Sequence, residues 1–126
     1  MSDGIKSYRD LLVWQKSMDL VVACYEITKK FPSQEMYGLV SQIRRAAVSI
    51  PANIAEGHGR KHRGDYLHHR SITRGSLLEL ETHFSIAARW GYLQPPEVEN
   101  ILRLTDKLGR MVSGLIQKLR SKPATS

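Results

Sequence analysis

Apolar side chains recur every three or four residues over four long stretches of the chain, which is the spacing of an amphipathic α-helix. The pattern predicts helices at about residues 10–30, 34–57, 65–90 and 96–120. Short segments containing glycine or proline separate them, so consecutive helices should pack as antiparallel neighbours. A length of 126 residues fits one domain. We therefore predict a single all-α domain, an up-down-up-down four-helix bundle spanning residues 1–126.

The second predicted helix carries few charges. Its apolar face on a helical wheel consists of Ile43, Ala46, Ala47, Ile50 and Ile54. Between Ser41 and Glu56, only Arg44, Arg45 and Glu56 are formally charged. A helix at the surface of a monomer normally turns a charged face to water. We therefore expect this helix to be covered on more than one side, which favours an oligomer.

Pro51 lies inside the same helical pattern. A proline within a helix removes one backbone hydrogen bond and costs about 3 kcal/mol. The apolar spacing nevertheless continues to Ile54, which predicts one helix that is kinked at Pro51. The alternative is a break at Ser49–Ile50, with Pro51 opening a new short helix.

A polar stripe runs beside the apolar face of the second helix, and small or polar residues including Glu79 form a similar stripe on the third. If the two helices turn around a point near residue 60, Arg45 lies level with the segment 76–79. We therefore predict that Arg45 and Glu79 share a partly buried polar network. Such a network fixes helix register more than it adds stability, because desolvation offsets the attraction. The predicted network comprises Gln42, Arg45, Asn53, Glu56 and Glu79.

The most basic segment joins the second and third helices. Residues 58–74 hold four histidines and five cationic side chains against one acid, Asp65, and the whole chain has a formal net charge of +7. An excess of positive charge favours polyanionic partners, although basic turns are also common as plain solvated loops. We select the five cations as candidate contacts to nucleic-acid phosphates: Arg60, Lys61, Arg63, Arg70 and Arg74.

Three motifs carry a family resemblance. The longest, FPSQEMYGLVSQIRRAAVSIPANIAEG, runs from Phe31 to Gly57, with DLLVW at residues 10–14 and GSLLELET at residues 75–82. Over about residues 8–120 the chain resembles the four-helix-bundle family encoded in intervening sequences of bacterial 23S ribosomal RNA genes. It is also similar to the accessory variability proteins of diversity-generating retroelements. The sequence departs from the family at Arg70, where an apolar residue is common, and at Thr73, where alanine is common.

The resemblance implies a bundle that assembles as a homopentamer. In the retroelement relatives it also implies a basic surface that binds nucleic acid and a reverse transcriptase. The leading hypothesis is therefore a non-catalytic, basic, oligomeric module that associates with RNA or DNA with low sequence specificity. The alternative is a protein-interaction scaffold that recruits a partner such as a reverse transcriptase or a ribosome-associated factor.

Motifs for enzymatic chemistry are not found in the sequence. There is no phosphate-binding GxxxxGK[ST] loop, and the histidines follow no metal-ligand spacing. The single Cys24 has no companion for a disulfide. We expect no catalytic residues, no metal and no cofactor; an enzyme would need a solvent-open pocket lined by the polar stripe. Without a signal peptide or an apolar run of about 20 residues, a cytoplasmic protein with no membrane partner is expected.

Overall fold

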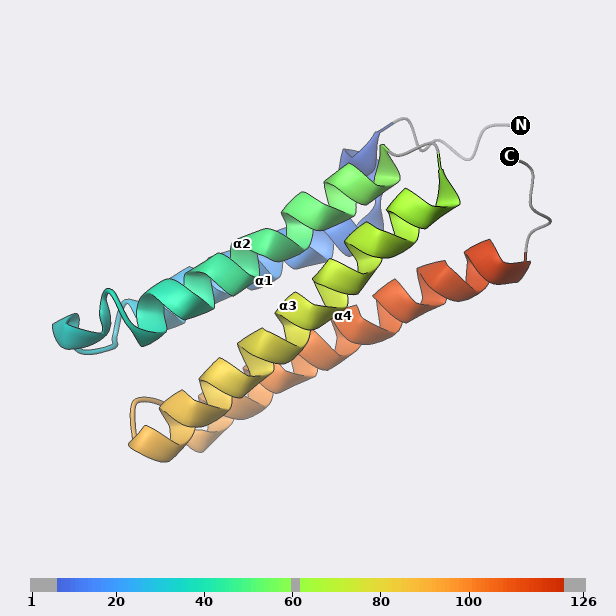
Figure 1. Cartoon of the computed structure of the whole chain (residues 1–126). Coiled ribbons are helices and arrows are strands. Elements are labelled where there is room, and N and C mark those ends of the chain that lie inside the picture. Colours follow the sequence, from blue (N-terminus) through green and yellow to red (C-terminus); the bar gives the residue numbers. More distant parts are fainter. Residues whose placement is uncertain (1–6, 60–61, 122–126) are drawn as a thin grey trace.

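The computed structural model describes residues 7–59 and 62–121, and the side chains of these residues except those of residues 63 and 115–121. Four long helices follow one another in the chain and run antiparallel to their neighbours (Figure 1). Their bounds are α1 Leu12–Thr28, α2 Leu39–His58, α3 Arg63–Trp90 and α4 Pro95–Ser121. Two short 3-10 turns, η1 at Tyr8–Asp10 and η2 at Ser33–Glu35, precede α1 and α2. The predicted all-α four-helix architecture is confirmed, and the described residues form no strand.

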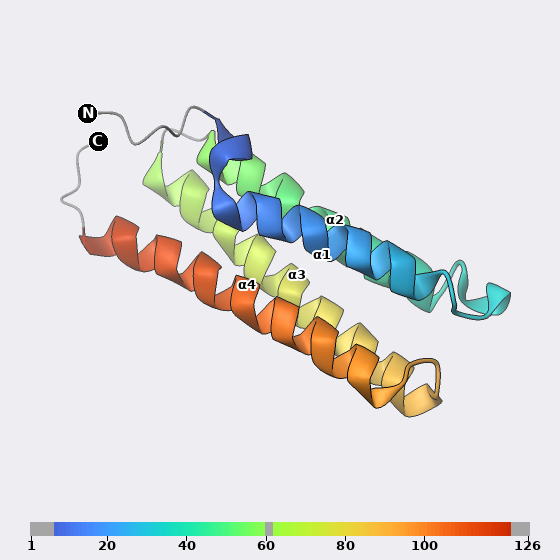
Figure 2. The same cartoon turned by 180° about the vertical axis from the view of Figure 1, so that it is seen from behind.

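The four helices occupy the corners of a square. Each helix packs on its neighbours in the chain, α1 also packs on α4, and no contacts join α1 to α3 or α2 to α4 within the described residues. Figure 1 shows α2 and α3 in front, and Figure 2 shows α1 and α4 in front. We call the end with η1 and the last turn of α2 the η1 end, and the opposite end, with η2 and the turn between α3 and α4, the η2 end.

Local hydrogen bonds decide where two helices start. Ser7 and Asp10 form a capping box around η1, with Ser7 Oγ accepting from the Arg9 amide at 3.1 Å, so α1 begins at Leu12 and not at residue 10. α2 begins at Leu39, five residues after the predicted start at residue 34. The Glu35 carboxylate accepts the Leu39 amide at 3.2 Å and so satisfies one of the free donors of the first turn.

α2 continues through Pro51 from Leu39 to His58, so the alternative of two helices separated at residues 49–50 is wrong. Pro51 has no amide hydrogen and leaves the Ala47 carbonyl without its helical partner. The ring is buried. Burial of the ring and of the apolar residues on either side, Ile50 and Ile54, favours one continuous element over a break.

The core lies along the centre of the bundle and contains the residues predicted for the apolar face of α2. Ile43, Ala47 and Ile50 are fully buried and pack in one cluster with Leu80 and Phe84 of α3. α2 and α3 share the most extensive contact. Their close approach needs the glycine at residue 57, because a β-carbon there would lie 3.2 Å from the His69 β-carbon.

Candidate functional site

A chain of hydrogen bonds links α2 to α3 near the η1 end. The Ser76 hydroxyl donates to Ser49 Oγ at 2.9 Å. The Asn53 side-chain nitrogen donates to Ser49 Oγ at 3.1 Å and to the Ser49 carbonyl at 2.9 Å. The Asn53 amide oxygen lies 2.9 Å from His69 Nδ1. Because this amide oxygen can only accept, Nδ1 of His69 must carry the proton and donate it.

The other imidazole nitrogen of His69 faces a carboxylate. His69 Nε2 lies 3.6 Å from Glu56 Oε2, and the two side chains are 12% and 58% exposed. Glu56 therefore holds the solvent end of the chain of bonds and Ser76, which is buried, holds the inner end. We call Ser49, Asn53, Glu56, His69 and Ser76 the α2–α3 polar network.

Two of the five residues predicted for a polar network, Asn53 and Glu56, belong to the α2–α3 polar network. Gln42 and Arg45 have exposed side chains, and Glu79 Oε2 instead lies 3.8 Å from His83 Nε2. No ion pair within residues 7–59 and 62–121 joins Arg45 to Glu79, and both side chains are exposed, so the predicted partly buried pairing is wrong. The hydrogen bond between Ser49 and Ser76 places Arg45 level with about residue 80, next to Glu79, so the error lies in the direction of the side chains and not in the register.

Sequence reasoning missed His69 as a member of the network and treated it as an exposed histidine of the basic segment. A signal was available, because His69 lies at helical spacing from Tyr66, Thr73 and Ser76 on the inward face of α3. In the structure His69 is half-buried, and its ring meets the His68 ring edge-on at 5.5 Å between centroids.

The five cations predicted to contact nucleic acid differ in what the structure describes. Arg60 and Lys61 lie outside the described residues, and Arg63 begins α3 with an undescribed side chain. Arg70 is half-buried and Arg74 is exposed. His62, His68 and the acid Asp65 are also exposed.

A groove of about 410 Å³ runs between α3 and α4 on the outside of the bundle. Arg74 and Arg110 line it together with two acids, Glu81 and Asp106. Both acids are engaged, because Glu81 accepts a hydrogen bond from the Thr105 hydroxyl at 2.8 Å and Asp106 pairs with Arg110. The groove also exposes Leu78, whose side chain is 57% accessible. It is therefore mixed in charge and partly apolar.

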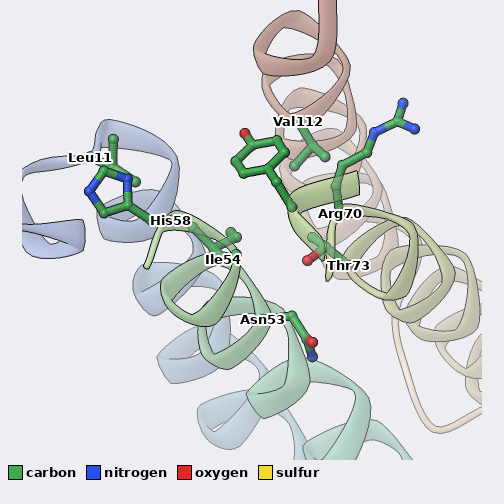
Figure 3. A pocket seen from close by; sticks show the side chains of 9 residues that line it. Leu11, Asn53, Ile54, His58, Arg70, Thr73 and Val112 are labelled. Atoms are coloured by element: carbon green, nitrogen blue, oxygen red, sulfur yellow. The ribbon is translucent and has the colours of Figure 1, made fainter. Parts of the chain in front are cut away.

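A smaller pocket of about 80 Å³ opens at the η1 end, where all four helical segments converge (Figure 3). Asn53 is the only member of the predicted polar stripe that lines it. Figure 3 shows Leu11 and His58 on one side and Val112 and Arg70 on the other. Among the described residues, the lining consists of Leu11, Asn53, Ile54, Gly57, His58, Tyr66, Arg70, Thr73 and Val112.

Other reactive groups are few in the described part of the chain. Burial raises the pKa of the Cys24 thiol to about 12, which keeps it protonated and unreactive at neutral pH. Within residues 7–59 and 62–121 no three His, Cys, Asp or Glu side chains converge as metal ligands do. None of the described helices is long and apolar enough to cross a membrane.

The arrangement of helices and motifs agrees with the comparisons with known proteins. The family described as 23S rRNA-intervening sequence protein matches residues 9–114, which is most of the chain. The chain belongs to that family. The motifs around Pro51 and Gly57, which build the α2–α3 interface, therefore lie within the region that the chain shares with this family.

A solved structure has the same fold as this chain. It is the 1.70 Å crystal structure of a protein with unknown function from the S23 ribosomal protein family of Bacteroides thetaiotaomicron. The TM-score is 0.78 at 24% identity, over 83% of this chain and 98% of that chain. At this identity the similarity shows the fold alone. A comparison with curated proteins found no match.

Proposed function

We propose that this protein is a non-catalytic, basic module that associates with RNA or DNA through contacts from Lys and Arg to phosphates. The observation that carries the proposal is the composition of residues 58–74, where five cations face a single acid. Arg74, His62 and His68 are exposed there, so they are available to a polyanion. Contacts of this kind release counterions and have little sequence preference.

We further propose that the protein acts as a homo-oligomer, with the number five taken from the family resemblance. Met18, Val22 and Tyr25 of α1 and Val48 of α2 are exposed on two helices that pack on each other, and we call them the α1–α2 outer face. Val22 is 59% exposed and Val48 is 45% exposed, which is unusual for a helix face that stays in water. A second copy would cover this apolar surface.

Arg44, a cation next to the α1–α2 outer face, is held by its own chain. The Arg44 guanidinium lies 4.4 Å from the centre of the Tyr25 ring, and Arg44 Nε donates to Thr28 Oγ1 at 3.0 Å. The Arg44 side chain is therefore stacked on an aromatic ring and hydrogen-bonded within its own chain, so its charge is already engaged at this surface. Five copies would also multiply the net charge of each chain, and avidity would strengthen weak phosphate contacts.

Fluorescence anisotropy with labelled RNA and DNA oligonucleotides tests the nucleic-acid proposal. Binding should be measurable at 50 mM salt and should weaken steeply by 200 mM. The test variant carries Arg60→Gln, Lys61→Gln and Arg74→Gln. Its control, with Lys29→Gln, Arg89→Gln and Arg103→Gln, loses the same charge from three exposed positions elsewhere on the bundle.

The test variant should lower the slope of log affinity against log salt by about 2 to 3, since each lost phosphate contact contributes about 0.7 to 0.9. The control should bind nearly as the wild type does. Equal losses in the two variants would mean that only net charge matters. If the wild-type protein binds neither RNA nor DNA at 50 mM salt, the proposal is refuted.

The groove between α3 and α4 supports a second candidate function, a scaffold that recruits a protein such as a reverse transcriptase or a ribosome-associated factor. Its exposed Leu78 and paired charges resemble surfaces that receive a partner helix. A Leu78→Glu variant should then abolish co-elution with the partner on a sizing column, while the triple variant of the basic segment should retain it. We place either activity in the cytoplasm, as expected from the sequence.

A further inference from the structure

A second partly apolar face lies on the side of the bundle formed by α2 and α3, which is in front in Figure 1. Ile72 of α3 lies three residues after His69 and four before Ser76, which both bond to α2, so it lies at the α2 edge of its helix. Glu79 and Ile86 continue this stripe at seven-residue intervals. Ile72 is 37% exposed and Ile86 is 50% exposed. We give the name α2–α3 outer face to Ile72, Gly75, Glu79 and Ile86.

Gly75 leaves a gap in this face. It lies inside the 28-residue helix α3, and apart from its own helical backbone no atom lies within 4 Å of the place that a β-carbon would take. A glycine inside a helix costs about 0.5–1 kcal/mol relative to alanine. No neighbour in the described part of this chain uses the space that the missing side chain leaves. A side chain of another molecule can therefore enter it.

α2 separates the α1–α2 outer face from the α2–α3 outer face, and its outward ridge carries few charges. Val48 and Ala52 are exposed on this ridge, and Arg45 is the charge nearest to them in the sequence. A helix surface that stays in water normally carries more charge. The side formed by α1 and α4 has such charges, among them Asp19 and Lys107, which are both exposed. The two sides that meet at α2 are therefore the ones best suited to be covered.

The square order of the helices decides which two sides can close a ring. Each copy in a ring presents two different surfaces to its two neighbours. Contacts through opposite sides of the square place successive copies in a line and build a filament. Contacts through two sides that share a corner turn each copy against the last, and the helix at that corner then lies towards the ring axis. For the α1–α2 and α2–α3 outer faces, that helix is α2.

We propose that the α1–α2 outer face of one copy packs on the α2–α3 outer face of the next, with α2 of every copy towards the axis of a closed ring. This inference rests on the proposed homo-oligomer and names the surface that the neighbouring copy contacts. Val22, at 59% the most exposed residue of the α1–α2 outer face, enters the gap at Gly75. The two apolar faces thereby cover each other. The groove between α3 and α4 stays on the outside of the ring, open to other partners.

Light scattering on two variants and on their mixture tests the arrangement. Val22→Glu damages one face and Ile86→Glu damages the other, so each variant alone should have the mass of a monomer. An equal mixture at high protein concentration should form dimers, because each variant still offers the face that the other has lost. Leu78→Glu is the matched control. It places the same charge on an exposed apolar position of α3 in the groove and should keep the wild-type mass.

The outcomes separate this inference from the proposal on which it rests. A wild-type protein with the mass of a monomer refutes the homo-oligomer itself. An oligomeric wild type whose mass survives Ile86→Glu refutes only this pairing of faces, and so do two variants that stay monomeric when they are mixed. If Ile86→Glu loses its helical circular dichroism spectrum, Ile72→Glu tests the same face.

Cross-linking tests the position of α2 independently. Ala52→Cys places a thiol on the outward ridge of α2, and Lys107→Cys places one on α4, which is diagonal to α2 in the bundle. The native Cys24 does not react at neutral pH, because burial raises the pKa of its thiol to about 12. A short bismaleimide should join copies of Ala52→Cys to one another and leave copies of Lys107→Cys single. Equal cross-linking of the two variants, or none in an oligomeric Ala52→Cys protein, would overturn the inward position of α2.

Discussion

Asn53→Ala is the substitution that tests the α2–α3 polar network most directly. Asn53 is the central member, because its side-chain nitrogen bonds Ser49 and its oxygen accepts from His69. The substitution removes three hydrogen bonds and leaves the Nδ1 proton of His69 without an acceptor. The His69 side chain is only 12% exposed, so water reaches the abandoned proton poorly.

The magnitude follows from burial and helix propensity. Leaving a buried donor unsatisfied costs about 1–3 kcal/mol. The lower half of that range applies here, because Asn53 is half-buried and Glu56 beside it is exposed. Alanine also forms helices better than asparagine and returns up to about 0.7 kcal/mol. The free energy of unfolding should therefore fall by about 0.3–2 kcal/mol.

Urea denaturation at one fixed protein concentration measures the effect, since an oligomer would make stability depend on concentration. With a slope m of about 2 kcal/mol/M, a loss of this size lowers the midpoint by about 0.2–1 M. Asn100→Ala is the matched control, because Asn100 is exposed and its one hydrogen bond, to Arg103, is 3.3 Å long. The control should stay within about 0.5 kcal/mol of the wild type.

Two outcomes would refute this reasoning. One is a midpoint for Asn53→Ala that coincides with that of Asn100→Ala. The other comes from the double variant Asn53→Leu, His69→Leu, in which both partners become apolar. Removing both partners should cost less than removing one, because no polar group is then left unsatisfied. A double variant less stable than Asn53→Ala would show that the hydrogen bonds are not the source of the effect.

The remaining predictions concern packing, pH and thiol chemistry. Gly75→Ala should raise the free energy of unfolding of a monomer by about 0.5–1 kcal/mol, because no atom lies within 4 Å of the added β-carbon. Gly57→Ala should give a less stable protein than Gly75→Ala does, because its added β-carbon would lie 3.2 Å from the His69 β-carbon of α3. Both are read from urea midpoints. Hydrogen bonds from the Lys30 amine and from a backbone amide hold the pKa of the Glu97 carboxyl below 4.5. The ionised carboxylate therefore stabilises the folded protein above pH 4.5, and this contribution to the free energy of unfolding is lost as the pH falls through the lowered pKa. Lys30→Met should therefore make stability fall less steeply below pH 4.5. Cys24, with its pKa raised from 9.0 to about 12, should react with iodoacetamide at pH 8 roughly a thousandfold more slowly in folded than in unfolded protein, as measured by mass spectrometry.

Most of the fold could be predicted because each long helix repeats its apolar spacing over many turns. The start of α2 could not, because Met36, Leu39 and Val40 continue the apolar pattern across the true boundary. The boundary depends on a side-chain bond, from the Leu39 amide to Glu35, and periodicity contains no information about it.

The polar network was predicted only in part because sequence spacing does not fix the direction of a side chain. The count around the turn near residue 60 that places Arg45 level with the segment 76–79 also places Asn53 level with His69, and that contact is present. Arg45 and Glu79 are both exposed, and Glu79 instead lies near His83 of its own helix. The level of two residues along antiparallel helices could therefore be predicted, but whether their side chains point at each other could not.

The square order of the helices relates the two proposed surfaces to each other. Because α1 contacts α2 and α4 but not α3, the side formed by α1 and α2 lies opposite the side formed by α3 and α4. Copies that join through the α1–α2 outer face therefore leave Arg74 and the groove beside it uncovered unless the neighbouring copy docks there. In a ring, each copy must offer two different surfaces to its two neighbours. If the second surface were the α3–α4 groove, Leu78→Glu would break the ring as well as any partner binding. If it were another surface, Leu78→Glu would leave the mass in solution unchanged and Val22→Glu alone would reduce it to that of the monomer. Light scattering on these two variants thus decides whether the groove faces a neighbouring copy or remains free for nucleic acid or protein.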